Sequence, residues 1–405
     1  MNEKGNKPEP SESPGTPLKL RRELCRGCTH CLRVCPTEAI RVRKGKAEIR
    51  AHRCVGCGEC MRICPHRAWT VENSRFDREF SRAVLDPSAF GQWGRVSPRR
   101  IKEAFSSIGF ASAADMTQAL RSAEQAISDF LFSDGRPFPA ISSNCPAVVQ
   151  LVQVKFPSLL ENLVPVAPYY EIAAALLKEA PLSGSLNVVY IVPCPAKASA
   201  ASKPRMPGGD FSAAVSLAEV FGPLRRALKD ANPGLAGKDE ARSGIEWAVT
   251  GGESRRTGAE RSLKVDGIHR VSGVMELAEN GRLDDVAFIE AWGCPGGCVG
   301  GPLNVENPFL AAFHAFGTGE GAGPGEDVAP LTSEANFRIP PPKSRGAMRL
   351  DRDLGAAMEK LRRIDETLKR FPGIDCGSCG CPNCLALAED VVQGFASETD
   401  CVVLR

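Results

Sequence analysis

Continuous apolar runs in the middle of the chain are typical of strands that are buried on both faces of a parallel sheet. Three such runs lie within FPAISS (138–143), LNVVYIVP (186–193) and DDVAFIEAWG (284–293). Helical patterns alternate with them, in AVVQLVQVKF (147–156) and EIAAALLKEA (171–180). Strands that alternate with crossover helices predict an α/β domain with a parallel sheet.

The segments on either side have other patterns. Residues 1–18 are polar and rich in proline, which predicts a disordered N-terminus. Residues 316–350 are rich in glycine and proline and predict a linker. A helix is expected at about 351–371, because apolar residues recur there at helical spacing. We expect this stripe to pack on the protein itself. It comprises Leu354, Met358, Leu361, Leu368 and Phe371.

The composition is that of a globular protein of two or three domains, with 405 residues of which 43% are apolar and 24% charged. The sequence shows no signal-peptide core and no uncharged apolar stretch of about 18 residues, so we expect a cytoplasmic protein without a membrane span. The net charge is +3, yet residues 18–70 carry 13 Lys and Arg against 4 Asp and Glu. Such a run can mark nucleic-acid binding. We instead expect no nucleic acid, because eight cysteines in this segment would hold anionic clusters that need positive charge.

The cysteines indicate bound metal, since reducing compartments disfavour disulfides. The chain has seventeen cysteines but five histidines, none of them paired at ligand spacing, which favours iron over zinc. The motif CxxCxxCxxxCP occurs twice, as CRGCTHCLRVCP and CVGCGECMRICP. In this repeat, three cysteines of one copy and the fourth of the other hold each 4Fe-4S cluster. One cluster is assigned to Cys25, Cys28, Cys31 and Cys64, and the other to Cys54, Cys57, Cys60 and Cys35.

This repeat resembles bacterial dicluster ferredoxins, which implies an α+β module at residues 19–75 that moves electrons. Paired zinc knuckles are the alternative, but they would not require this repeat with its prolines.

Four more cysteines follow the three strand-like runs. They are Cys145, Cys194, Cys294 and Cys298. Ligands collect at the carboxyl ends of parallel strands, so the three loops could bring the four thiols together at one iron site. Taken singly, Cys145 or Cys194 is better explained as a buried core cysteine than as a ligand, whereas the four cysteines together favour the iron site.

The motifs SSNCPAV, VPCPAK and EAWGCPGGCVGGP resemble the active-site motifs of FeFe (iron-only) hydrogenases, in order and approximate spacing, over residues 84–305. The resemblance implies a cubane on the four central cysteines, with Cys298 also bridging to a diiron subsite that carries carbonyl and cyanide ligands. Lys197 matches a lysine that pairs with a cyanide of that subsite, and its alternative is a surface lysine. The glycines of the third loop would let the backbone approach the cluster closely. They are Gly296, Gly297, Gly300 and Gly301.

Four positions depart from the hydrogenase pattern. Asn144 stands where active enzymes carry a cysteine that relays protons, and an amide does not titrate. Val148 replaces a tryptophan, Trp292 a methionine and Ala200 a glutamate. These changes put fast turnover in doubt, and the domain resembles the divergent, sensory branch of the family.

The C-terminal cysteines resemble the small 4Fe-4S domain of corrinoid iron-sulfur proteins and of the B subunit of Rnf complexes. A structural zinc is the alternative. The implied ligands are Cys376, Cys379, Cys384 and Cys401, and Cys381 is expected not to be a ligand. The expected parts of the chain are an N-terminus at 1–18, a ferredoxin-like domain at 19–75, a hydrogenase-like domain at 80–315, a linker at 316–350 and a helical 4Fe-4S domain at 351–405.

The resemblances imply reversible H2 oxidation and proton reduction at a diiron site fed by 4Fe-4S clusters, either slow or sensory. Such an oxidoreductase would exchange electrons with a ferredoxin or with a signalling or oxidoreductase subunit. The alternative is an iron-sulfur assembly or electron-transfer protein with a plain cubane at the same four cysteines. Lys197 and the glycine-rich loop favour the diiron version, because a cubane alone has no cyanide to pair with.

Overall fold

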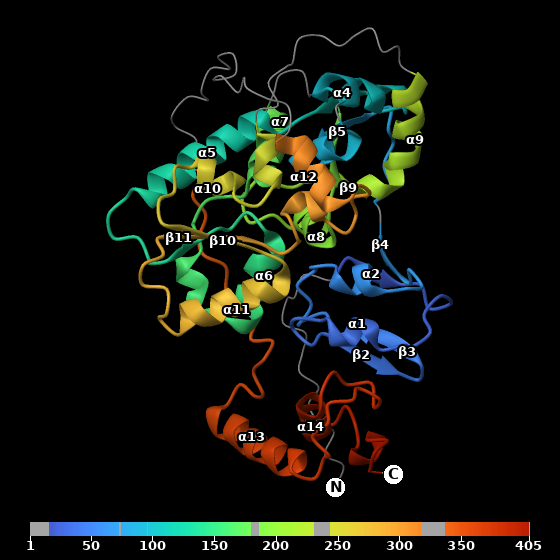
Figure 1. The fold of residues 1–405 in the computed structure, drawn as a ribbon, viewed down its shortest axis with the longest axis vertical. Helices are drawn as coiled ribbons and strands as arrows, with labels where there is room; N and C mark the ends of the chain where they lie inside the picture. The colour runs from blue at the N-terminus through green and yellow to red at the C-terminus, as the bar shows by residue number, and fades with distance from the viewer. Residues whose placement is uncertain are drawn as a thin grey trace.

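The computed structural model describes residues 16–72, 74–94, 96–179, 186–230, 244–316 and 337–404. The described chain forms three parts, and the N-terminal part lies between a central α/β domain and the C-terminal helices (Figure 1). Most of the expected N-terminal tail and much of the expected linker lie outside the described residues. Within these ranges, no helix is long and apolar enough to cross a membrane.

The N-terminal part is a small α+β module. Strand β1 pairs with β4 and β2 pairs with β3, both antiparallel, and short helices follow the cysteine loops. Leu32, Val55 and Trp69 are buried beneath them. The elements are β1 (Leu18–Leu20), α1 (His30–Arg33), β2 (Ile40–Arg43), β3 (Lys46–Ile49), α2 (Glu59–Ile63) and β4 (Trp69–Val71).

The central domain contains two parallel sheets. One has the strand order β6-β5-β8-β9 and the other β10-β11-β7. The three apolar runs of the sequence form β7, β8 and β11, which confirms the prediction of buried parallel strands. The strands are β5 (Ser81–Leu85), β6 (Ser112–Ala114), β7 (Ala140–Ile141), β8 (Asn187–Val192), β9 (Ala213–Ser216), β10 (Ser262–Asp266) and β11 (Phe288–Trp292).

Helices cover these sheets, and the two helical patterns of the sequence form α6 and α7. Every residue of β11 is buried, which agrees with a strand covered on both faces. The helices of the domain are α3 (Pro87–Phe90), α4 (Pro98–Ser107), α5 (Thr117–Leu131), α6 (Pro146–Lys155), α7 (Tyr169–Glu179), α8 (Pro195–Ser202), α9 (Leu217–Asp230), α10 (Gly252–Arg256), α11 (Ile268–Glu279) and α12 (Pro308–Phe316).

The C-terminal part has a second, smaller core around α13 (Leu354–Leu368) and α14 (Cys384–Val392). Ile364 and Phe371 are buried in this core, but the first half of the α13 stripe is not. Leu354 is 76% exposed and Met358 65% exposed, and Leu361 is also exposed. The expectation that the whole stripe packs on the protein is therefore wrong, because α13 is covered only toward its C-terminal end.

Candidate functional site

The central cysteine loops begin where parallel strands end. Cys145 follows β7 and Cys194 follows β8, and each is the N-cap of the next helix. The proline after each cysteine takes the first helical position, where its missing N–H costs no hydrogen bond. Cys294 and Cys298 follow β11. The prediction that these four thiols lie at strand ends is confirmed.

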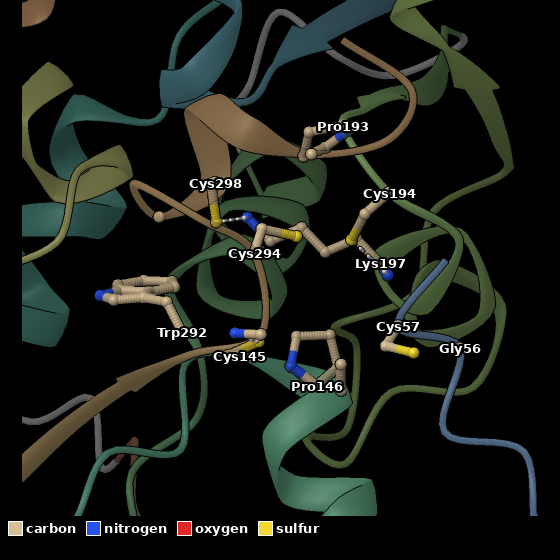
Figure 2. Close-up of a pocket in the computed structure, with 14 residues that line it drawn as sticks. Gly56, Cys57, Cys145, Pro146, Pro193, Cys194, Lys197, Trp292, Cys294 and Cys298 are labelled. Carbon is tan, nitrogen blue, oxygen red and sulfur yellow. Dashed lines mark hydrogen bonds between the residues drawn. The ribbon is translucent and has the colours of Figure 1, made fainter. Parts of the chain in front are cut away.

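The four thiols line one cavity (Figure 2). Burial raises the pKa of Cys294 to about 11, and it also raises the pKa of Cys194 and of Cys298 above the ordinary thiol value. Cysteine binds metal as the thiolate, so bound iron would supply the positive charge that these buried sulfurs lack. Four buried thiols around one cavity therefore fit a cubane. In the described part of the chain, no group of three or more His, Cys, Asp or Glu side chains is placed to hold a single metal ion.

The glycines of the third loop are required by its own backbone packing. Gly297 has a φ of +93°, and a Cβ there would lie 2.6 Å from the Ala248 carbonyl oxygen. A Cβ on Gly300 would lie 2.0 Å from the oxygen of Pro295, and one on Gly301 would lie 2.3 Å from that of Pro193. The glycines thus let the loop backbone pass close to neighbouring carbonyl groups, and this packing holds Cys294 and Cys298 on a tight turn.

Lys197 is fully buried on α8. Its Nζ atom lies 2.6 Å from Asp86 Oδ2 and 3.3 Å from Cys298 Sγ, and it also donates to the hydroxyl of Tyr169. A lysine has three N–H donors, so these contacts use all of them. The alternative of a surface lysine is therefore wrong.

Asp86 supplies the anion that this lysine needs. It lies at the end of β5, is fully buried, and accepts a hydrogen bond of 2.6 Å from the hydroxyl of Tyr190. Burial by itself raises the pKa of Asp86, but the charge and hydrogen bond of Lys197 outweigh burial and hold the pKa below its ordinary value. The sequence analysis missed Asp86, which is more than a hundred residues from Lys197 along the chain.

Of the four departures from the hydrogenase motifs, Trp292 lines the cavity, and Asn144 directly precedes the cavity residue Cys145. Asn144 is buried, and its Nδ2 atom donates to Glu253 Oε1 at 2.9 Å. Trp292 lines the cavity, and its ring N–H donates to Glu290 at 2.8 Å. Val148 is buried in α6. Sequence reasoning did not single out either glutamate.

The structure groups the ferredoxin cysteines as the repeat predicts. One pocket is lined by the four cysteines assigned to the first cluster. Burial raises the pKa of Cys57 well above its ordinary value, with further increases from the charges of Cys35, Cys60 and Cys54. The fourth cysteine of each motif thus lies with the other copy, as exchange of ligands between the copies requires. The ligand roles themselves are proposals.

The second ferredoxin loop adjoins the central cavity. Gly56 and Cys57 line that cavity together with the four central cysteines (Figure 2). A Cβ on Gly58 would lie 2.5 Å from Pro302, so the two loops are in close contact. Arg62 donates to the carbonyl oxygen of Gly300 at 2.6 Å. These contacts leave no intervening layer between the two candidate cluster sites.

The C-terminal cysteine loop adjoins the first ferredoxin pocket. The N–H of Val42, a residue that lines this pocket, donates to Gly380 at 2.9 Å, and Arg33 donates to the Cys376 carbonyl oxygen at 2.6 Å. Gly380 has a φ of +80°, and a Cβ there would lie 1.9 Å from the carbonyl oxygen of Val42. The C-terminal cysteine loop is therefore docked on the ferredoxin-like module.

A charged network fixes this docking. Asp390 is buried and accepts hydrogen bonds from Arg41 and Arg43, and Arg50 lies 2.7 Å from it. The sequence analysis assigned the basic run of residues 18–70 to compensation of clusters, whereas these three arginines surround a carboxylate of the C-terminal domain. Cys381 is held in the same network, since its Sγ atom accepts from Arg43 at 3.3 Å. Of the four C-terminal cysteines assigned to a cluster, the second core contains Cys379, Cys384 and Cys401.

Comparison with protein families agrees with all three parts. The family of the iron-only hydrogenase large subunit, C-terminal domain, matches residues 81–232 and 239–302, which is more than half of the chain. The family of 4Fe-4S dicluster domains matches residues 24–68. An Fe-S cluster family matches residues 371–403. No curated protein matches the chain.

Solved FeFe-hydrogenases are among the structures that it resembles. One, solved to follow stepwise H-cluster assembly, is 14% identical, with a TM-score of 0.45 over 58% of this chain and 84% of the other. Another, from Chlamydomonas reinhardtii, is 15% identical, with a TM-score of 0.44 and the same coverage. A third, which concerns oxygen inactivation through the 2Fe subcluster, is 14% identical, with a TM-score of 0.44 over 60% and 86% of the two chains.

Proposed function

Because this chain belongs to the family of the iron-only hydrogenase large subunit, C-terminal domain, we propose that it is an iron-sulfur redox protein with a cubane at its central cysteines. The observation that carries this proposal is the shared cavity. Gly56 and Cys57 of the ferredoxin-like module line the same cavity as Cys145, Cys194 and Cys298. An electron on the second ferredoxin cluster would therefore reach the central cubane directly.

The contacts give the candidate clusters an order. The C-terminal cysteine loop touches the first ferredoxin pocket through Val42 and Gly380, and the second ferredoxin loop touches the central site. Electrons would pass along this line to or from a redox partner, which we expect to be a ferredoxin or an oxidoreductase or signalling subunit. Thiolate-bound clusters also favour a reducing compartment such as the cytoplasm.

The chain's own residues prepare the central site for one-electron chemistry. Apolar side chains such as Pro146 and Ala147 line the cavity and exclude water from it. Lys197 donates to Cys298 Sγ and so stabilises negative charge on that sulfur. The cubane, when bound, would supply the electron-accepting iron. Hydrogen bonds to cluster sulfurs raise the reduction potential, so this contact would favour the reduced state.

Hydrogen oxidation or sensing at a diiron subsite is the second candidate. The buried Lys197 and the glycine-rich loop favour it, since related enzymes use both next to that subsite. The hydrogen bonds of Lys197 oppose it, because Asp86, Tyr169 and Cys298 already take its three donors. The side chain of Asn144 does not titrate, so it cannot relay the protons that hydrogen turnover requires. The site therefore supports a plain cubane, and an electron-transfer role, better than hydrogen turnover.

The infrared spectrum of anaerobically matured protein separates the two candidates. We expect about sixteen irons per chain, as four cubanes require, and no carbonyl or cyanide stretches. A matured FeFe-hydrogenase serves as the positive control for the maturation system. Carbonyl and cyanide bands would establish the diiron site and overturn the plain cubane. An iron count of about eight would instead contradict the central and C-terminal cluster sites.

A further inference from the structure

Two fully buried carboxyl groups, on different elements, lie near the central cavity. Glu290 is in the middle of β11, and Glu253 is on the short helix α10. Glu290 accepts four hydrogen bonds, from the N–H of Gly251 at 2.7 Å, the ring N–H of Trp292 at 2.8 Å, and the N–H and hydroxyl of Ser254 at 2.8 and 2.5 Å. These donors come from three residues, Gly251, Ser254 and Trp292, and both carboxyl oxygens of Glu290 accept from them.

Glu253 has fewer donors than its neighbour. It accepts hydrogen bonds from the hydroxyl of Ser142 at 2.7 Å and from Asn144 Nδ2 at 2.9 Å. Two neighbouring carboxylates cannot both be ionised at low cost in a buried site. Burial, and then the charge of Glu290, raise the pKa of Glu253 to about 8. Glu253 is thus the member of the pair that binds a proton near neutral pH.

The surrounding charged groups do not neutralise this pair. Arg256, on the same helix as Glu253, is committed to Glu124 of α5 and to Glu246 of the neighbouring turn. Asp266, on β10, accepts from Thr250 and from the N–H of Gly296. Among the described residues, no ion pair joins Glu253 or Glu290 to a basic side chain. The pair therefore keeps a net charge that a proton can change.

Glu290 is hydrogen-bonded to a residue that lines the central cavity, and Glu253 to a residue next to one that does. Glu253 is bonded to Asn144, which directly precedes Cys145. Glu290 is bonded to Trp292, whose side chain lines the cavity. An added electron at the cavity and an added proton at Glu253 would therefore act on one another across a single residue, within a buried region of low dielectric constant.

We propose that Glu253 and Glu290 form a proton-binding site that is coupled to reduction of the central cubane. The inference rests on the proposed cubane at the central cysteines. In the coupled step, one electron would pass from a ferredoxin cluster to the cubane held by the four central cysteines, and the carboxylate of Glu253 would take up one proton from solvent. The net charge of the buried region is then unchanged. By reciprocity, reduction tightens proton binding, and proton binding raises the reduction potential.

The test is a redox titration of the holoprotein, followed by electron paramagnetic resonance at several pH values between about 6 and about 10. The signal that a Cys145→Ser variant lacks identifies the central cubane. Full coupling of one proton to one electron lowers the potential by about 59 mV per pH unit, since the proton concentration changes tenfold. Because the pKa of Glu253 is about 8 before reduction, the wild-type potential should be independent of pH below that value and should approach this slope above it. The slope should vanish in Glu253→Gln. Glu246→Gln, a change at a nearby partly exposed glutamate, should keep the wild-type slope.

A second variant and a second measurement support the test. Ser142→Ala removes a hydrogen-bond donor to the Glu253 carboxylate, so the pKa of Glu253 should rise. The reduction potential should then depend on pH over a higher pH range, with the slope retained. Infrared difference spectra should show a protonated carboxyl C=O band that appears on reduction and is absent from Glu253→Gln. If Glu253→Gln does not fold, the upward movement in Ser142→Ala decides the question.

The outcomes separate failure of this inference from failure of the proposed function. If the iron count and the resonance spectrum lack a central cubane, the proposed function is wrong. If the cubane is present and its potential does not depend on pH, the coupling is wrong. A slope that persists in Glu253→Gln would assign the proton to another group and would also overturn the inference.

Discussion

Replacing Asp390 by asparagine should release the C-terminal domain from the ferredoxin-like module. The side chain of Asp390 is fully buried, and Arg41 binds both of its oxygens, at 2.8 and 3.0 Å. Arg50 lies 2.7 Å and Arg43 3.2 Å from the same carboxylate. Asparagine keeps the size of the side chain but removes the charge that the three guanidinium groups share.

The expected effect follows from the cost of an unpaired buried charge. Breaking a buried ion pair by removing one partner costs about 3–5 kcal/mol. At about 1.4 kcal/mol for each factor of ten, the ratio of docked to undocked domain would fall by about 100- to 4,000-fold. The adjacent pair of Arg53 and Glu389 remains, so the effect should lie toward the lower end of this range. Undocking would separate the C-terminal cysteine loop from Val42 and the first ferredoxin pocket.

Two measurements would detect the release of the C-terminal domain. Small-angle X-ray scattering should show a larger radius of gyration for Asp390→Asn than for the wild type. Stopped-flow reduction should show slower electron exchange between the C-terminal cluster and the other clusters. Asp365→Asn, at an exposed position of α13, is the matched control and should behave like the wild type. If Asp390→Asn keeps both the wild-type scattering profile and the wild-type rate, the arginine network does not hold the domain in place.

Two further changes test other sites. Asp86→Asn leaves the buried Lys197 without its anion, so the free energy of unfolding should fall by about 3–5 kcal/mol. Because the pKa of Asp86 is lowered in the folded protein, its stabilising contribution is present above the ordinary aspartate pKa and is lost as the pH falls through the lowered value. Denaturant titrations at several pH values would refute the assignment if the variant were as stable as the wild type. Cys401→Ser should remove about four irons, those of the C-terminal cluster, and leave the other resonance signals in place. Loss of the central signal would contradict the assignment of Cys401.

The strands and cysteine loops could be predicted because both depend on local patterns. A continuous apolar run identifies a buried strand, and a proline after a cysteine marks the start of a helix, so Cys145 and Cys194 could be placed at strand ends. The charged partners could not be placed in this way. Asp86 meets Lys197, and Asp390 meets Arg41, only after distant segments have packed together.

One of the missed residues did leave a signal in the sequence. Glu290 interrupts a continuous apolar run, FIEAW, and a charged residue inside a buried strand requires several hydrogen bonds. Glu253 left no comparable signal, because an acid between glycine and serine on a short helix looks like a surface residue. For α13, the sequence pattern led to the opposite error, a prediction of burial for residues that are exposed. Its periodic stripe predicts burial, whereas Leu354 and Met358 are exposed.

The distribution of buried charge links the three parts of the molecule. Lys197 is balanced by Asp86, and Asp390 is balanced by the arginines of the ferredoxin-like module, so neither group needs to change its charge when electrons move. Glu253 and Glu290 have no such partner among the described residues. A buried site responds to an added electron most readily where a proton can enter to balance it. The carboxyl pair is hydrogen-bonded to Asn144 and Trp292 beside the central cavity, at the inner end of the line of candidate clusters, which is where charge compensation is needed most.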